Sequence, residues 1–209
     1  MPTRRPSLVV IAGPNGSGKT TLTNDVLAHR WLDGHEYINA DAIAQNEFGD
    51  WNSREAVLKA ARRADERRET CLRERRDFAF ETVFSTDSKL KFVERAAKAG
   101  YFVRLYFVGT TDPSINIRRV QDRVADGGHD VPTDKIVARY HRAMANLVLV
   151  LPIVDRGYVF DNSVDSRPAK RWLRTVEGAV RRMADGPAPR WVEETRAILD
   201  MDRWLDEGR

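Results

Sequence analysis

The segment GPNGSGKT, residues 13–20, constrains this chain more than any other, because it fits the phosphate-binding pattern G-x-x-x-x-G-K-S/T. It follows the apolar, β-branched run SLVVIAG, residues 7–13, which is typical of a buried parallel strand. A helical pattern from Lys19 to His29 comes directly after it. A glycine-rich loop in this setting turns its N–H groups toward a polyphosphate at the positive end of a helix. The sequence therefore predicts a P-loop that binds a nucleotide.

Residues of this loop have separate expected roles in phosphate binding. Lys19 would reach the β- and γ-phosphates, and the Thr20 hydroxyl would hold Mg²⁺. Asn162 lies in DNS, residues 161–163, after the last predicted strand, where we expect it to border the nucleotide base. Further nucleotide contacts are expected from the rest of the loop, namely Gly13, Asn15, Gly16, Ser17, Gly18 and Thr21.

Strand-like and helical segments alternate along the chain, which favours an α/β fold with a parallel sheet flanked by helices. The expected strands are 7–13, 36–41, 77–84, 101–109 and 157–162. The expected helices are 19–29, one to about Arg76 with Asn52 and Glu55 as a capping pair, 89–99, 113–125, 133–149 and 168–183. GPAP, residues 186–189, reads as a linker, so we expect a kinase-like domain over 1–185 and a C-terminal amphipathic helix over 190–209 that packs on it.

Composition narrows the function classes. The chain has 209 residues, of which 42% are hydrophobic and 32% charged, as expected of a folded domain. No apolar run approaches the roughly 18 residues of a membrane span, and the N-terminal run is too short for a signal peptide, so we expect a cytoplasmic protein. Cys71 is the single cysteine, which excludes an intramolecular disulfide. Arginines are spread among nearly as many acids, so nucleic acid is not the expected partner.

Several nucleotide-binding classes lack support in this sequence. It contains no N-K-x-D guanine-reading motif and no LSGGQ-like transporter signature. The clearest strand, YFVRLYFVG, lacks the terminal Asp of a usual Walker B motif, which disfavours a motor. Other residues must therefore complete the nucleotide site.

Two acids end predicted strands, Asp41 in YINAD and Glu81 in FAFET. In a parallel α/β sheet the residues at the carboxyl ends of strands face the ligand crevice. Phosphoryl transfer needs one carboxylate that takes the proton of the accepting hydroxyl, and tolerates a second that supports Mg²⁺ through water. We therefore expect both acids in front of the γ-phosphate. The alternatives are a helix N-cap for Asp41 and a surface acid for Glu81.

The segment 119–142 carries arginines on both sides of a Gly-Gly pair. Arg119 and Arg123 share one helix face, and Arg139 and Arg142 share another. The glycines and proline between them allow the backbone to bend while the flanking helices stay stiff. We predict a lid over about 112–149 that brings guanidinium groups to the charge developing on the transferred phosphoryl. A solvent-exposed helical hairpin is the alternative.

These motifs together resemble the short stand-alone members of the zeta toxin-like P-loop kinases. The resemblance is carried by GPNGSGKTT, NAD at 39–41, ET at 81–82, RVQDRVADGGHDVP with ARY at 138–140, NL at 146–147 and YVFDNS, in this order from about Val9 to Ser163. It implies an adenylate-kinase-like fold and ATP- and Mg²⁺-dependent phosphorylation of a small-molecule hydroxyl. In zeta toxins the acceptor is a UDP-activated amino sugar.

The resemblance also implies roles by motif position. Lys19 and Thr20 would contact phosphates and metal, Asp41 would be the base and Glu81 would lie near the acceptor. The lid cations would be Arg119, Arg123 and Arg139. An antitoxin partner is possible in such a family, although nothing in the sequence supports one.

Two other functions stay open at this point. The pI near 9.4 suggests a polynucleotide 5′-hydroxyl kinase. A non-catalytic, nucleotide-dependent binding module that engages a partner through its C-terminal helix is the second.

Overall fold

The computed structural model describes residues 4–27, 32–49, 53–128 and 130–207, with all of their side chains except those of Leu27 and residues 202–207. None of the helices in these ranges is long and apolar enough to cross a membrane. The elements, in chain order, are β1 Ser7–Ala12, α1 Lys19–Leu27, β2 Glu36–Ile38, α2 Ala40–Phe48, α3 Arg54–Glu74, β3 Phe78–Thr82, α4 Asp87–Lys98, β4 Phe102–Gly109, α5 Pro113–Ala125, α6 Thr133–Val150, β5 Arg156–Asp161, β6 Lys170–Val176, β7 Ala179–Met183 and α7 Arg190–Glu207.

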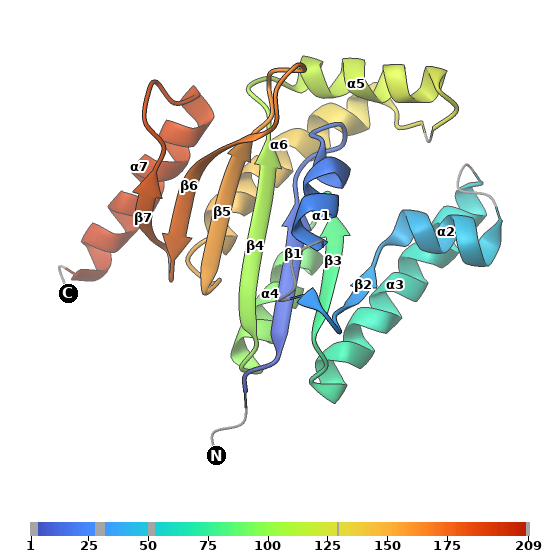
Figure 1. Ribbon diagram of the computed structural model, residues 1–209, viewed down its shortest axis with the longest axis horizontal. Helices are drawn as coiled ribbons and strands as arrows, with labels where there is room; N and C mark the ends of the chain where they lie inside the picture. Colours follow the sequence, from blue (N-terminus) through green and yellow to red (C-terminus); the bar gives the residue numbers. More distant parts are fainter. Residues whose placement is uncertain (1–3, 28–31, 50–52, 129, 208–209) are drawn as a thin grey trace.

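All described strands join one sheet in the order β2-β3-β1-β4-β5-β6-β7 (Figure 1). The first five pair in parallel, and β6 and β7 are antiparallel. The predicted α/β class and the parallel core are therefore confirmed. Because β1 lies between β3 and β4, the loops after these strands meet at the carboxyl edge of the sheet, where parallel α/β folds bind ligands.

The helix predicted over 168–183 is wrong, since this segment forms the hairpin of β6 and β7. Glu177 and Gly178 connect the two strands with φ angles of 51° and 76°. Two consecutive positive φ angles match the right-handed twist of a tight hairpin. On β6, Trp172, Leu173 and Thr175 are buried whereas Arg171 and Arg174 are exposed, and register shifts in the pairing with β5 and β7 interrupt the strict alternation of a strand.

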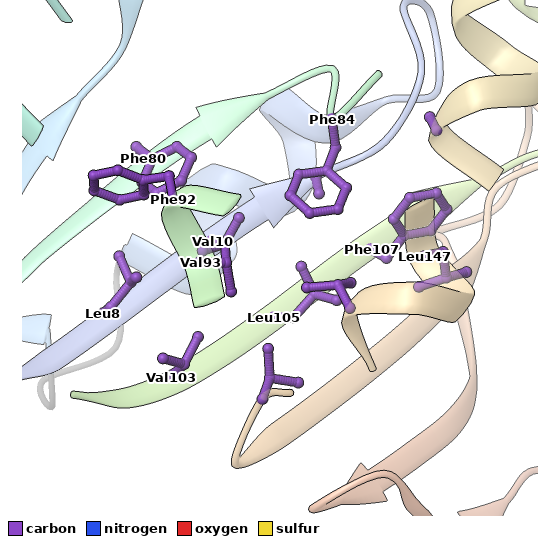
Figure 2. Close-up of a cluster of buried hydrophobic side chains, with 14 of the residues drawn as sticks. Leu8, Val10, Phe80, Phe84, Phe92, Val93, Val103, Leu105, Phe107 and Leu147 are labelled. Carbon is purple, nitrogen blue, oxygen red and sulfur yellow. The ribbon is translucent and has the colours of Figure 1, made fainter. Parts of the chain in front are cut away.

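The main core lies between the sheet and α3, α4, α6 and α7. Figure 2 shows side chains of β1, β3 and β4 packed against those of α4 and α6. The rings of Phe80 and Phe92 meet edge to face, with centroids 5.7 Å apart. A smaller cluster on the opposite face, built on Val9, Ile11 and Val26, packs α1 onto the sheet. The sheet is thus anchored on both sides of the strands that carry the P-loop and Glu81.

The second predicted strand is too long, because β2 ends at Ile38. The Asn39 side chain accepts hydrogen bonds from the N–H groups of Asp41 and Ala42, and α2 begins at Ala40. Asp41 therefore lies in the first turn of a helix, beyond the end of the strand, and Asn39 is the N-cap.

For α3 the predicted cap Asn52 lies outside the described residues. The Ser53 side chain is the N-cap that accepts a hydrogen bond from the Ala56 N–H.

The C-terminal helix α7 contacts the ends of β4 and β5. The Trp191 Nε1–H donates to Asp161 Oδ2 over 3.0 Å, and the Trp191 ring lies beside Phe107. Val192 is fully buried, whereas Ile198 and Met201 are exposed. Domain boundaries at 1–185 and 190–209 stay a prediction, but these contacts pack α7 against β4 and β5 of the sheet.

Trp191→Phe should lower the free energy of unfolding by about 1–2 kcal/mol, because the hydrogen bond to the Asp161 carboxylate is lost while the smaller phenyl ring keeps only part of the packing beside Phe107. Chemical denaturation monitored by far-ultraviolet circular dichroism measures the change. Ile198→Ala, on the exposed side of the same helix, is the matched control and should change stability less. Equal effects of the two substitutions would show that the Asp161 contact contributes nothing.

Candidate active site

The P-loop joins β1 to α1 and lies beneath α5 in Figure 1. Gly16 and Gly18 adopt φ angles of 72° and 89°, in the left-handed region that favours glycine. A side chain at Gly18 would also overlap the amide nitrogen of Asn162. Glycine is therefore required at this position for both its backbone conformation and its close contact.

Lys19 is the first residue of α1, and its side chain is buried. Its Nζ donates to the carbonyl oxygen of Pro14 over 2.9 Å. Burial lowers the pKa of Lys19 below its usual value, while the carboxylates of Glu81 and Asp41 act in the opposite direction. A nearby anion strongly stabilises a buried ammonium group whose hydrogen-bond acceptor is a neutral carbonyl oxygen. A nucleotide phosphate would be such an anion.

Two asparagines that bracket the P-loop hold its backbone. Asn116 on α5 is fully buried, and its Nδ2 donates to the carbonyl oxygen of Asn15 over 2.6 Å. Its Oδ1 accepts from the Thr110 hydroxyl. The Asn162 Nδ2 donates to the carbonyl oxygen of Ser17 over 2.9 Å. The structure thus brings Asn162 to the loop backbone, and its expected contact with the base stays a prediction.

Sequence reasoning missed Asn116. A polar residue three positions after Pro113 looks like one more surface position of a helix. Only the packing of α5 against the loop after β1 makes it buried. The available signal was its place in the first turns after an Asp-Pro N-cap, at the end of a buried strand.

Asn116→Ala should lower stability by about 2 kcal/mol, because it leaves the buried Thr110 hydroxyl and the Asn15 carbonyl without this partner. It should also weaken nucleotide binding, since the loop loses its tie to α5. Denaturant unfolding and titration with an ATP analogue measure the two effects. Asn24→Ala, at an exposed position of α1, is the control, and an Asn116→Ala protein equal to it in both assays would contradict this role.

The two predicted carboxylates both border the same cavity. Glu81, at the end of β3, accepts hydrogen bonds at Oε2 from the Thr23 hydroxyl at 2.9 Å and the Tyr37 hydroxyl at 3.3 Å. Burial, and secondly Glu81, raise the pKa of Tyr37 to about 12, so Tyr37 remains a donor at neutral pH. Asp41 is exposed toward the cavity from the first turn of α2. The two carboxylates therefore differ in their surroundings: two hydroxyl groups donate hydrogen bonds to Glu81, whereas the Asp41 side chain is exposed.

The three lid arginines in the predicted site line this cavity from α5 and α6. Arg119 pairs with Asp165 over 2.6 Å and approaches the carbonyl oxygen of Gly16 at 3.5 Å. Arg139 Nη1 donates to Asn15 Oδ1 over 3.3 Å. Arg123 is close enough to lower the pKa of Lys19. The structure thus brings Arg119, Arg123 and Arg139 to the P-loop.

Arg142 does not join them. Its side chain is exposed, and its Nε donates to the carbonyl oxygen of Ala138 on the same helix. The bend between α5 and α6 contains Gly127, with a φ angle of 85°, and the Gly128 N–H closes α5 by donating to the carbonyl oxygen of Arg123. His129, in the predicted hinge, lies outside the described residues.

The loop after β3 has a feature that the sequence did not reveal. Phe84 has a φ angle of 59°, which is strained for a bulky side chain. Its ring is fully buried in the core (Figure 2). Its N–H donates to Thr82 Oγ1, and its carbonyl accepts from Asn146 Nδ2 on α6 over 2.9 Å. These contacts fix Val83 and Ser85 on the cavity wall.

Together these elements enclose a cavity of about 620 Å³. Among the described residues it is lined by Asn15, Gly16, Gly18, Lys19, Thr20, Asn39, Ala40, Asp41, Ala61, Arg68, Glu81, Thr82, Val83, Phe84, Ser85, Thr86, Lys89, Arg119, Arg123 and Arg139. Gly13, Ser17, Thr21 and Asn162 are predicted nucleotide contacts that do not line it. A volume of this size holds a small ligand, and the P-loop, the two carboxylates and the arginines of α5 and α6 border one shared space.

The residues present fit a bound nucleotide with a hard cation. The Ser17 hydroxyl is buried and has no hydrogen-bond partner within the described part of the chain, so the loop retains an unsatisfied polar group. The neighbouring Thr20 hydroxyl and the oxygens of Asp41 and Glu81 are the ligand type that Mg²⁺ prefers. Cations of the loop and lid fit phosphate oxygens.

Comparison with known proteins agrees with this geometry. Residues 1–163 match the family profile described as Zeta toxin. The chain belongs to the zeta toxin family. This confirms the resemblance predicted from the motifs. One relative is an uncharacterized protein of Haemophilus influenzae. It is 29% identical to this chain over 135 residues, which cover 63% of this chain and 91% of the relative.

Two solved structures share the fold of this zeta toxin family protein. A chain in the AvrRxo1-ORF1:-ORF2 complex has a TM-score of 0.66 and 18% identity, and the match covers 93% of this chain and 64% of the other. The present chain thus spans less than two thirds of that structure. A chain of the PezAT toxin-antitoxin system of Streptococcus pneumoniae has a TM-score of 0.59 and 16% identity, covering 95% of this chain and 85% of the other. At such identities the likeness concerns the fold.

Proposed function

We propose that this protein is an ATP- and Mg²⁺-dependent kinase that phosphorylates a hydroxyl group of a small molecule. The observation that carries the proposal is one cavity whose lining combines the P-loop lysine and the arginines of α5 and α6 with the carboxylates of Asp41 and Glu81. Phosphoryl transfer depends mainly on positioning and on neutralising charge, and such a cavity supplies both.

In the proposed step the acceptor oxygen attacks the γ-phosphorus of ATP while its proton passes to the Asp41 carboxylate. The bond between the γ-phosphorus and the bridging oxygen breaks, and ADP leaves with that oxygen. Asp41 suits the base because it is exposed to the cavity. Glu81, held by Thr23 and Tyr37, suits a fixed position beside the acceptor.

The proposed roles of the cations follow from their positions. Lys19 binds the β- and γ-phosphates, and Arg123 and Arg139 neutralise the charge that grows on the transferred group. Arg119, already paired with Asp165, approaches the P-loop carbonyl and orients the lid. Mg²⁺, held by the Thr20 hydroxyl, would offset charge on the phosphate oxygens.

The experiment that tests this function measures ADP formation from ATP and Mg²⁺ with a panel of UDP-sugars, nucleosides and sugars. A UDP-activated amino sugar is the first acceptor to test, because membership of the zeta toxin family makes it the leading candidate. Turnover that depends on an acceptor supports the kinase. Equal turnover without any acceptor would make the protein an ATPase and overturn the proposal.

A further inference from the structure

The lining of the cavity includes residues that the proposed phosphoryl transfer does not use. One wall, formed by α3 and by the start of α4, carries Arg68, Ser85, Thr86 and Lys89. We call these four residues the anion subsite. They lie on the side of the two carboxylates, since α3 packs against α2, which carries Asp41, and Arg68 stacks on Phe80 of β3, the strand that contains Glu81.

Arg68 is an unusual residue in this position, because it is only 4% exposed although it sits on a highly charged helix. Its guanidinium lies over the Phe80 ring at 5.0 Å and pairs with Asp65. Stacking on an aromatic ring fixes the plane of the guanidinium group. Buried arginines are rare in proteins without a binding partner for their remaining donors.

Lys89 completes a shared ion pair on the same wall. Its Nζ lies 2.6 Å from Oδ1 of Asp65, the oxygen that Arg68 also contacts. One carboxylate therefore serves two cations, and Asp65 itself does not line the cavity. The wall keeps an excess of positive charge facing the cavity.

The N-terminus of α4 also borders the cavity, and its first turn carries Asp87, which offsets part of the positive end of the helix. Thr86 is its N-cap residue, with no side-chain capping hydrogen bond, and Ser85 before it is buried. Both line the cavity, so the positive end of a 12-residue helix borders it. The strained Phe84 backbone, held by Asn146, fixes this turn in place.

We propose that the anion subsite binds a carboxylate or phosphate group of the acceptor, so that the substrate is a hydroxylated acid and a neutral sugar or nucleoside is a poor acceptor. Arg68 and Lys89 would donate to the anion, and the Ser85 hydroxyl and the α4 N-terminus would complete its hydrogen bonds. The substrate class rests on the proposed kinase function, whereas anion binding at this wall does not.

The first test measures anion binding alone. Inorganic phosphate is titrated into protein that is saturated with a non-hydrolysable ATP analogue and Mg²⁺, so that the P-loop is filled. Lys89→Met should weaken phosphate binding about tenfold or more, and Lys89→Arg should restore most of it. Lys91→Met, at an exposed position on the same helix, is the matched control and should bind as the wild type does. Equal binding by Lys89→Met and Lys91→Met would overturn the proposal.

The second test concerns the substrate. Neutral acceptors are compared with their acidic counterparts, such as glucose with gluconate and glucose 6-phosphate, and N-acetylglucosamine with its 1-phosphate. Comparing kcat/KM for the carboxylate-containing and the phosphate-containing acceptors shows which of the two anions the subsite binds better. We expect turnover with an acidic member, and a KM for it that Lys89→Met raises about tenfold or more with little change in kcat. Equal kcat/KM for neutral and acidic members would contradict the substrate class.

Failure of the two proposals can be told apart. Lys89-dependent phosphate binding without transfer to any acceptor would leave the anion subsite standing and remove the kinase. Efficient transfer to neutral acceptors, with phosphate binding indifferent to Lys89, would leave the kinase standing and remove the anion subsite.

Discussion

Lys19→Met is expected to reduce phosphoryl transfer by about a hundredfold to a thousandfold. Its ammonium group is buried beside the P-loop and, within the described residues, donates to the Pro14 carbonyl. The arginines of α5 and α6 would remain in the cavity lining, but the ammonium group proposed to contact the β- and γ-phosphates from the start of α1 would be lost. Steady-state turnover and titration with an ATP analogue measure the effect.

The same substitution should leave the fold intact. Burial lowers the pKa of Lys19, so the empty site holds a charge at a free-energy cost, and methionine of similar length removes that cost. We expect a melting temperature no lower than that of the wild type. A Lys19→Met protein with wild-type activity would contradict the role of the P-loop. An unfolded Lys19→Met protein would contradict the free-energy cost that we assign to burying the Lys19 charge.

Asp41→Asn should reduce kcat by about a hundredfold to ten-thousandfold and leave ATP binding nearly unchanged. Asparagine keeps the size and position of the side chain in α2 but cannot take the hydroxyl proton. The Asn39 cap should hold α2 in both proteins, because it bonds backbone N–H groups. Single-turnover transfer with a saturating acceptor measures the chemical step.

Glu81→Gln provides the decisive comparison for the base. The Thr23 and Tyr37 hydroxyls can still donate to the amide oxygen of the substituted side chain, so the local structure should survive. We expect a smaller loss of kcat than for Asp41→Asn. Should the order be reversed, with full chemistry in Asp41→Asn and none in Glu81→Gln, Glu81 would be the base.

Helices and strands that depend on short-range sequence patterns could be predicted. Apolar runs indicate the central strands, and the Asp112-Pro113 pair begins α5 as expected. The hairpin after β5 was missed, because Arg, Val and Ala occur in helices and strands alike and only the Glu177-Gly178 turn marks it. The start of α2 was placed incorrectly: the main prediction extended the strand to Asp41 and the alternative made Asp41 the N-cap, whereas the N-cap is Asn39.

The residues of the candidate site also fall into two groups, those in a local motif and those brought together only by tertiary contacts. The P-loop residues proposed to bind phosphates lie in one continuous motif, so the sequence contains their arrangement. Arg68 and Lys89 were not predicted, because charges on long amphipathic helices usually face water and nothing local shows that β3 packs beneath them. Asn116 and Asn146 likewise act only through tertiary contacts, with Asn15 and Phe84.

Direct detection of the transferred phosphoryl group tests the kinase most strictly. Wild type, Lys19→Met and Asp41→Asn would each be incubated with Mg²⁺, ATP labelled at the γ-phosphate and the acceptor panel, and the label would be followed by mass spectrometry. The account predicts an acceptor that carries the label with the wild type and hardly any with the two variants. Label found only in inorganic phosphate, or in the acceptor at equal rates with all three proteins, would contradict it.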